Sequence, residues 1–214
     1  KIWNKLILKK YAYKSHNNLM TMLEYQKKEK ITLKCLTELR THGVEICFVD
    51  DLNSKFVENK LKEKKVDVTI FTGGGLIKKN IIENSGLGVL NCHMGKLPIY
   101  RGMDVVEWPL LMRDFNNLGF TIHFMDCGID TGAILKVFDV KILKEDDINS
   151  LRYRFEPIMV KNFVETIVLF LNAKIKPKTQ NHDDGKQYYI MDKLLQNIAN
   201  ENLKKRNNIV YENN

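Results

Sequence analysis

The sequence lacks the long apolar runs and the targeting features that mark membrane and secreted proteins. No run approaches the ~20 apolar residues that a membrane-spanning helix needs, and the longest, 163–171, is interrupted by Glu165 and Thr166. Residues 1–10 have no long apolar centre and no small-residue cleavage site, so no signal peptide is predicted. We therefore expect a soluble, cytoplasmic protein without a membrane partner.

Cysteine is scarce, and its spacing suits neither a disulfide framework nor a zinc site. The four cysteines (Cys35, Cys47, Cys92 and Cys127) form no Cys-x-x-Cys pair. Isolated cysteines are typical of reduced intracellular proteins, whereas structural zinc sites usually draw on paired ones. We expect free thiols and no metal.

Positive charge is concentrated at one end of the chain. The net charge is +8, and residues 1–40 supply +7 of it, with ten Lys or Arg against three Glu. A basic segment with interleaved aromatic residues fits either a solvated helix face or contact with a phosphate-bearing partner such as a nucleic acid. The solvated helix is the favoured interpretation.

Short apolar runs alternate with helix-forming segments along the 214 residues, 44% of which are hydrophobic. Strands are predicted at 44–49, 66–71, 89–92, 120–125, 133–142 and 186–191. Helices are predicted at 17–41, 77–83, 104–113 and 192–205. A further helix is capped by one of the polar residues among 50–54 and ends at Lys64, and a long helix begins at Asp146 or Asp147. Gly43 is placed to cap the first helix, and Pro157 to kink or end the long one. The alternation favours an α/β fold with a doubly wound, mainly parallel sheet that gathers ligands at its strand carboxyl ends.

Polar residues that suit acyl-transfer chemistry lie in the middle of the chain. Asn91 and His93 stand two residues apart at a predicted strand end, so an amide and an imidazole can converge on one oxyanion. Asp130 lies in a glycine-containing loop, where its carboxylate could hold the imidazole in one tautomer or pass protons, and Asp126 is its rival. Each residue alone also fits a structural role, as a turn cap, a packed imidazole or a turn aspartate.

Other candidate groups carry weaker signals. The glycine triplet 73–75 could cradle phosphate, but it lacks the spacing of the nucleotide-binding fingerprints. His123 lies on a predicted strand, where a histidine is expected to be packed or hydrogen-bonded and not catalytic. His16, His42 and His182 belong to no recognisable constellation.

Two motifs together resemble the formyltransferase family that uses 10-formyltetrahydrofolate. The first is NCHMGKLPIYRG at 91–102, and the second is GFTIHFMDCGIDTG at 119–132. The motifs occur in the family's order, and the similarity extends over about 44–142. The family includes glycinamide ribonucleotide formyltransferase, methionyl-tRNA formyltransferase and the sugar N-formyltransferases, to which this chain is most similar. The resemblance implies a Rossmann-like fold of the formyltransferase type.

The resemblance also implies a site. Asn91 and His93 would stabilise a tetrahedral oxyanion as a substrate amine attacks the formyl carbon, and Asp130 would assist proton transfer. The co-substrate 10-formyltetrahydrofolate would lie against two loops, whose residues are Thr72, Gly73, Gly74, Gly75, Leu76, Asp126, Cys127, Gly128 and Ile129. The acceptor would lie near Tyr100, Arg101 and Gly102.

The chain departs from the family pattern in two places. Met94-Gly95 stands where relatives commonly have Pro-Ser, and the family's opening strand has no counterpart before Lys1. We therefore expect a fold without its first strand, in a chain truncated at its N-terminus. The expected organisation is a basic helical lead-in at 1–43, a formyltransferase catalytic domain at 44–173 and a short extension with a terminal helix at 174–214.

Several functions stay open at this point. The favoured one is transfer of a formyl group from 10-formyltetrahydrofolate to a nucleotide-linked amino sugar, since the motif around Tyr100 resembles the sugar and tRNA branches. No second domain of the kind that grips tRNA is seen, which disfavours tRNA as a partner. The alternatives are a methionyl-tRNA or glycinamide ribonucleotide formyltransferase, a formyltetrahydrofolate hydrolase, and a non-catalytic nucleotide- or nucleic-acid-binding module. A homodimer is left open.

Overall fold

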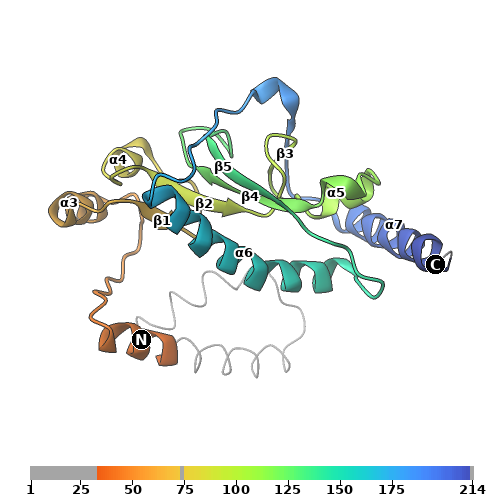
Figure 1. Ribbon diagram of the computed structural model, residues 1–214, viewed down its shortest axis with the longest axis horizontal. Helices are drawn as coiled ribbons and strands as arrows, with labels where there is room; N and C mark the ends of the chain where they lie inside the picture. Colours follow the sequence, from red (N-terminus) through yellow and green to blue (C-terminus); the bar gives the residue numbers. More distant parts are fainter. Residues whose placement is uncertain (1–32, 73–74, 213–214) are drawn as a thin grey trace. The chain divides into compact units, whose positions relative to one another are not determined.

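The computed structural model describes residues 33–72 and 75–212, and the chain divides into two compact units, Lys1–Leu52 and Asn53–Asn214 (Figure 1). Most of the basic segment, and residues 17–32 of the first predicted helix, lie outside the described residues. In the first unit, residues 33–41 are helical as predicted. Gly43 follows with a φ of +74°, and backbone N–H groups of Gly43 and Val44 bond back into the last helical turn. This is the predicted left-handed cap.

The strand predicted at 44–49 is not formed. Val44 and Phe48 stay exposed, at 44% and 57%, and no strand pairs with this segment in the described part of the chain. Strand formation depends on packing against neighbouring strands more than on composition. The prediction was therefore wrong because apolar composition alone does not supply a pairing partner.

The second unit holds a four-stranded sheet in the order β1-β2-β4-β5. Its strands are β1 (Thr69–Phe71), β2 (Val89–His93), β4 (Gly119–Phe124) and β5 (Ile134–Asp139). β1 pairs with β2 in parallel, whereas β2–β4 and β4–β5 are antiparallel. A separate parallel pair joins β3 (Tyr100–Gly102) to β6 (Lys186–Tyr188).

The α/β class is confirmed, but the pairing is more mixed than predicted. The expectation of a mainly parallel sheet is right for β1–β2 and wrong for the two antiparallel pairs of the same sheet. A parallel neighbour needs a crossover of about a dozen residues or more, usually a helix. The connection between Phe124 and Ile134 is too short for one, so β5 must return antiparallel to β4.

Five helices of the second unit surround these strands. They are α3 (Lys55–Lys64), α4 (Lys79–Ile82), α5 (Glu107–Leu111), α6 (Ile148–Leu171) and α7 (Lys193–Glu212), with 3-10 turns at Phe115–Asn117 and His182–Asp184. Asp147 caps α6 in a capping box with Ser150, as the sequence predicted for one of the two aspartates there. Pro157 lies inside α6 and does not end it, so that part of the prediction was wrong.

α6 lies along one face of the sheet (Figure 1) and contributes to both hydrophobic clusters of the core. Its buried apolar residues recur every four positions, which places them on one side of the helix. They are Leu151, Phe155, Met159, Phe163 and Ile167. β4 sends Phe120 and Ile122 into the same core. Because side chains alternate along a strand, Thr121 and His123 face the opposite side, which is where the loops of the site lie.

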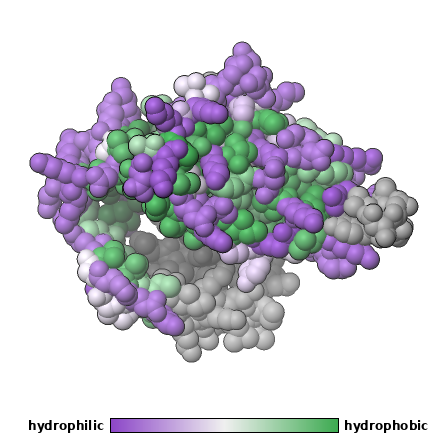
Figure 2. Space-filling model, in the orientation of Figure 1, coloured by the Kyte–Doolittle hydropathy of each residue, from purple (hydrophilic) through white to green (hydrophobic). Residues whose placement is uncertain are grey.

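The other side of α6 is partly apolar as well. Val160, Val164 and Val168 are 64%, 58% and 52% exposed, and green apolar side chains lie among charged ones where α6 crosses the face in view (Figure 2). No helix in the described part of the chain is both long enough and apolar enough to cross a membrane.

Candidate active site

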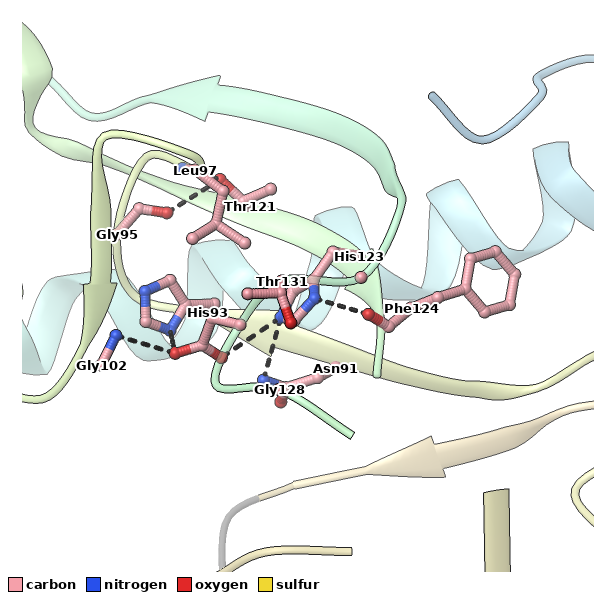
Figure 3. Close-up of polar contacts among 12 residues, drawn as sticks. Asn91, His93, Gly95, Leu97, Gly102, Thr121, His123, Phe124, Gly128 and Thr131 are labelled. Atoms are coloured by element: carbon pink, nitrogen blue, oxygen red, sulfur yellow. Dashed lines mark hydrogen bonds and ion pairs between the residues drawn. The ribbon is translucent and has the colours of Figure 1, made fainter. Parts of the chain in front are cut away.

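The register between β2 and β4 places four polar side chains on one face of the sheet. Asn91 pairs with His123, and His93 pairs with Thr121. Residues directly opposite each other on antiparallel strands share a face and lie close enough to interact. An asparagine, two histidines and a threonine therefore gather at the carboxyl end of β2 (Figure 3).

His123 is oriented by its two ring nitrogens. Its Nδ1 lies 2.7 Å from the carbonyl oxygen of Phe124, and its Nε2 lies 3.3 Å from the Asn91 amide nitrogen (Figure 3). A carbonyl oxygen can only accept, so Nδ1 carries the proton and Nε2 of the neutral ring accepts from Asn91. One amide hydrogen of Asn91 is thus held by His123, which leaves the other to donate elsewhere.

Asp130 lies between the two imidazoles. Its Oδ2 accepts a hydrogen bond of 2.9 Å from the Gly102 backbone N–H and lies 3.4 Å from His93 Nδ1. Its Oδ1 lies 3.5 Å from His123 Nε2. The backbone of Asp130 has a φ of +53°, in the left-handed region that aspartate tolerates better than most residues. The loop therefore delivers the carboxylate to the end of β2.

His93 is buried, and both of its ring nitrogens have neighbours. Nε2 lies 2.9 Å from the carbonyl oxygen of Tyr100, and Nδ1 faces Asp130. The predicted arrangement, in which Asn91 and His93 donate to one atom from two sides, is not what the geometry favours. His93 is turned toward the Asp130 carboxylate, while Asn91 is paired with His123.

Burial and neighbouring charges set the protonation of this pair. Burial lowers the pKa of the His93 ring below its usual 6.5, against the opposing influences of the Asp130 charge and the Tyr100 carbonyl. For Asp130, burial alone would raise the pKa, but the two neighbouring imidazole rings and the hydrogen bond from the Gly102 N–H together lower it. Near neutral pH the pair is therefore a carboxylate beside a neutral imidazole.

The side chain of Asp126, the alternative to Asp130, forms hydrogen bonds within its own turn. Its Oδ1 accepts from the Gly128 N–H at 3.0 Å and from the Thr131 hydroxyl at 2.6 Å. Those two bonds make it the turn aspartate that the structural interpretation described. Gly132 closes the same loop, where a Cβ atom would collide with the carbonyl oxygen of Phe124.

The two loops predicted to hold the folate are exposed where they are described. Gly73 and Gly74 lie outside the described residues, whereas Thr72, Gly75 and Leu76 are exposed. Asn53 fixes the end of this loop, because its side chain donates to Leu76 O at 3.0 Å and accepts from Lys78 N at 2.6 Å. On the second loop Cys127 and Gly128 are exposed, and Ile129 is 38% exposed.

The residues predicted to bind the acceptor take different positions. The Tyr100 ring is buried, with its hydroxyl donating to Asp114 at 2.8 Å, so its contribution to the site is the carbonyl that meets His93. Arg101 donates to Gly185 O at 3.3 Å and is half-buried. Gly102 supplies its N–H to Asp130.

Sequence reasoning undervalued two residues that hold the site. His123 is buried and hydrogen-bonded as predicted, but its partners were not foreseen: it contacts both Asn91 and Asp130, and the alternation of β4 with an antiparallel register would have placed it there. Gln180 donates from its amide to the carbonyl oxygens of Asp130 and Gly132 at 3.0 and 2.6 Å. No motif in the sequence pointed to Gln180.

The cysteines take no part in this network. All four are free, and burial raises the pKa of the Cys92 thiol, which lies between Asn91 and His93 in the chain, to about 12. Such a thiol stays protonated and unreactive. Among the described residues there is no group of three or more His, Cys, Asp or Glu side chains that could hold a metal ion.

Comparison with known proteins places this geometry in a family. Residues 23–167 match the model of the family described as formyl transferase. The methionyl-tRNA formyltransferase of Clostridioides difficile (strain 630) is 29% identical over 147 residues, which are 68% of this chain and 47% of that protein. The chain spans about half the length of the first curated relatives it matches.

Solved structures agree on the fold. The formyltransferase PseJ from Anoxybacillus kamchatkensis, solved with UDP-4,6-dideoxy-4-formamido-L-AltNAc and tetrahydrofolate, is 27% identical, with a TM-score of 0.58 and coverage of 75% of this chain and 83% of that one. A sugar N-formyltransferase from Shewanella is 18% identical, with a TM-score of 0.59 and coverage of 78% and 70%, which speaks to the fold alone. The predicted Rossmann-like formyltransferase fold is confirmed, and the chain belongs to the formyl transferase family.

Proposed function

We propose that this chain transfers the formyl group of 10-formyltetrahydrofolate to the amine of a nucleotide-linked sugar. The observation that carries the chemistry is the Asn91–His123 and His93–Asp130 arrangement at the end of β2, which offers an amide donor beside a carboxylate base. Membership of the formyl transferase family supports the donor, as does tetrahydrofolate in the PseJ structure.

The amine nitrogen attacks the formyl carbon, and the carbonyl oxygen becomes an oxyanion. The amide hydrogen of Asn91 that His123 does not hold stabilises this oxyanion by hydrogen bonding. The carboxylate of Asp130 takes the proton that the attacking nitrogen loses. When the tetrahedral centre collapses, the bond between the formyl carbon and N10 breaks, N10 takes up a proton, and the products are the N-formyl sugar and tetrahydrofolate.

His93 acts in this scheme as a proton acceptor behind Asp130. With Nε2–H donated to Tyr100 O, the Nδ1 lone pair faces Asp130 Oδ2 at 3.4 Å. A proton that reaches Asp130 can therefore pass to His93 and return through Asp130 to N10 as the C–N10 bond breaks, so both groups end the cycle in the protonation state in which they began it. Burial favours this role, because it lowers the pKa of His93 and keeps the ring neutral near pH 7.

Two observations support a nucleotide-linked sugar as the acceptor. PseJ, whose structure holds a UDP-linked formamido sugar, is matched over most of its own length. In addition, aromatic rings adjoin the site, since Tyr188 pairs with Gly102 in the β3–β6 register and packs 5.1 Å from Trp108. Tyr189, the next residue, is 68% exposed. Aromatic faces of this kind suit stacking of a nucleobase.

The test is an activity panel with purified chain and 10-formyltetrahydrofolate. Nucleotide-linked amino sugars, glycinamide ribonucleotide and charged initiator tRNA are offered separately, and both the formylated product and tetrahydrofolate are measured. Formylation of a sugar nucleotide, lost in Asn91→Ala, is the expected result. Turnover on another acceptor and none on the sugars would overturn the acceptor assignment.

Two other functions have support of their own. Several curated relatives that the chain matches are methionyl-tRNA formyltransferases, which favours charged tRNA as the second acceptor to test. A hydrolase would use water in place of the amine, and formate release at full rate without acceptor would identify it. A non-catalytic nucleic-acid-binding module would instead show steeply salt-dependent RNA binding and no effect of Asn91→Ala.

A further inference from the structure

We propose that Gln180 is a positioning residue that holds Asp130 beside His93, an inference that rests on the proposed function for its catalytic meaning. Gln180 lies 50 positions after Asp130 in the sequence, in the segment that follows α6. Its amide nitrogen donates to Asp130 O at 3.0 Å and to Gly132 O at 2.6 Å. One side chain thus bonds two carbonyl groups of the turn that presents the carboxylate, that of Asp130 itself and that of Gly132.

The turn needs such support. Asp130 has a left-handed backbone with a φ of +53°, a conformation that costs free energy for any residue except glycine. Among the described residues, the side chain of Asp130 is held by the Gly102 N–H and by its two histidine neighbours. If the turn relaxed, the carboxylate would leave the 3.4 Å position from which it faces His93 Nδ1.

The chemistry at position 180 requires a neutral group with two N–H donors. Both partners are carbonyl oxygens, which can only accept, so the amide nitrogen and not the amide oxygen must face them. The Gln180 Oε1 atom is consequently left buried and without a hydrogen-bond partner in the described part of the chain. Leaving a buried acceptor unpaired is unfavourable, and the amide keeps this orientation because the two carbonyl groups determine it.

The backbone around Gln180 is itself anchored on the sheet. Lys178 and Ile134 exchange two backbone hydrogen bonds of 2.7 and 2.8 Å, so residue 178 is paired to the first residue of β5. Farther along the segment, Gly185 packs against Pro98 so closely that a Cβ atom would collide with the Pro98 carbonyl oxygen. The backbone that carries Gln180 is therefore paired to a strand on one side and packed against Pro98 on the other, so the Gln180 side chain extends from an anchored segment.

The test is an NMR titration of the His93 ring in the full chain, with resonances assigned through His93→Gln. Gln180→Leu keeps roughly the side-chain volume and removes both donors without adding charge. Gln187→Leu is the matched control, because Gln187 is exposed on β6 in the same segment. Asp130→Asn shows what the His93 ring does when the carboxylate is gone.

We expect Asp130→Asn to lower the pKa of His93, since a neighbouring carboxylate favours the charged ring. Gln180→Leu should lower it in the same direction, and Gln187→Leu should leave it at the wild-type value. In turnover assays Gln180→Leu should lose about 10- to 100-fold in kcat, with the KM for 10-formyltetrahydrofolate within about threefold of wild type. A folded Gln180→Leu chain with wild-type His93 titration and wild-type kcat would overturn the proposal.

Two safeguards keep the outcomes separate. If Gln180→Leu does not fold, Gln180→Met removes the same donors with an unbranched side chain and is read by the same criteria. If the wild-type chain formylates no acceptor, the proposed function fails, yet the titration still decides whether Gln180 holds Asp130 against His93. A normal titration in an active wild-type chain and in both variants would refute the positioning role alone.

Discussion

His123 makes one hydrogen bond to the Phe124 carbonyl and one with the Asn91 amide, and substitution by asparagine or by glutamine removes one of them and keeps the other. An asparagine amide reaches the place of Nδ1 and can donate to the Phe124 carbonyl, but it leaves the Asn91 amide without its acceptor. A glutamine amide reaches the place of Nε2 and can accept from Asn91, but it leaves the Phe124 carbonyl unpaired. The wild-type distances for these two bonds are 2.7 and 3.3 Å.

The two variants should be alike in stability and different in activity. Each loses one neutral, part-buried hydrogen bond, worth about 0.5–1.5 kcal/mol. For a chain of this size that corresponds to a fall in Tm of about 1–6 °C. His123→Asn should lose at least about tenfold in kcat, up to the 10²–10³ that removal of an oxyanion donor costs. His123→Gln should stay within about threefold of wild type, a difference of about 0.65 kcal/mol in barrier height.

Thermal melts monitored by circular dichroism and steady-state formylation of the preferred acceptor measure the two quantities. The catalytic comparison is valid because both substitutions are neutral, polar and similar in volume. Equal losses of kcat in the two variants, or a larger loss in His123→Gln, would show that His123 does not act through Asn91.

Four further outcomes follow from the described contacts. Asn91→Ala should lower kcat by about 10²–10³ with little change in donor KM, and Asp130→Asn should lower it by about 10²–10⁴, both read from steady-state kinetics against wild type. The pKa of His93 is lower in the folded chain than in the unfolded chain, so the unfolded chain binds a proton at this ring first as the pH falls. The free energy of unfolding should therefore be constant with respect to His93 above about pH 6.5 and should decrease below it. Thermal melts across that pH range should show a smaller decrease in His93→Gln. Asp147→Ala should remove the cap of α6 and lower stability by about 0.5–2 kcal/mol in urea titration while leaving kcat unchanged, and a loss of kcat without loss of stability would contradict a purely structural role.

Local signals in the sequence were enough for most elements and for the central part of the site. The apolar residues at every fourth position from Leu151 to Ile167 predict a helix, and Gly43 predicts a helix cap. Both predictions depend only on residues within one or two helical turns, so the local sequence is enough for them. The shared face of Asn91 and His93 was predicted for the same reason, since side chains alternate along one strand, while their catalytic roles stay a proposal.

The parts that sequence reasoning missed depend on pairing between distant segments. The antiparallel register that brings His123 opposite Asn91 is set by a short connection and by packing, and neither appears in the composition of β4. Gln180 contacts Asp130 only because Lys178 pairs with Ile134 on the sheet. The prediction for residues 44–49 was wrong for the opposite reason: they have the composition of a strand, but no strand pairs with them within the part of the chain that the structure describes.

The hydrogen bonds from Gln180 to the Asp130 turn also have a consequence for the order in which the site is completed during translation. The ribosome adds about 5–20 residues per second, so the 50-residue separation between Asp130 and Gln180 corresponds to a delay of roughly 3–10 s. During that interval β2, β4 and the Asp130 turn have all been synthesised, but the amide that ties the turn down has not. If Gln180 has the proposed role, the Asp130 turn is therefore fixed only after the segment that follows α6 has left the ribosome and paired with the sheet.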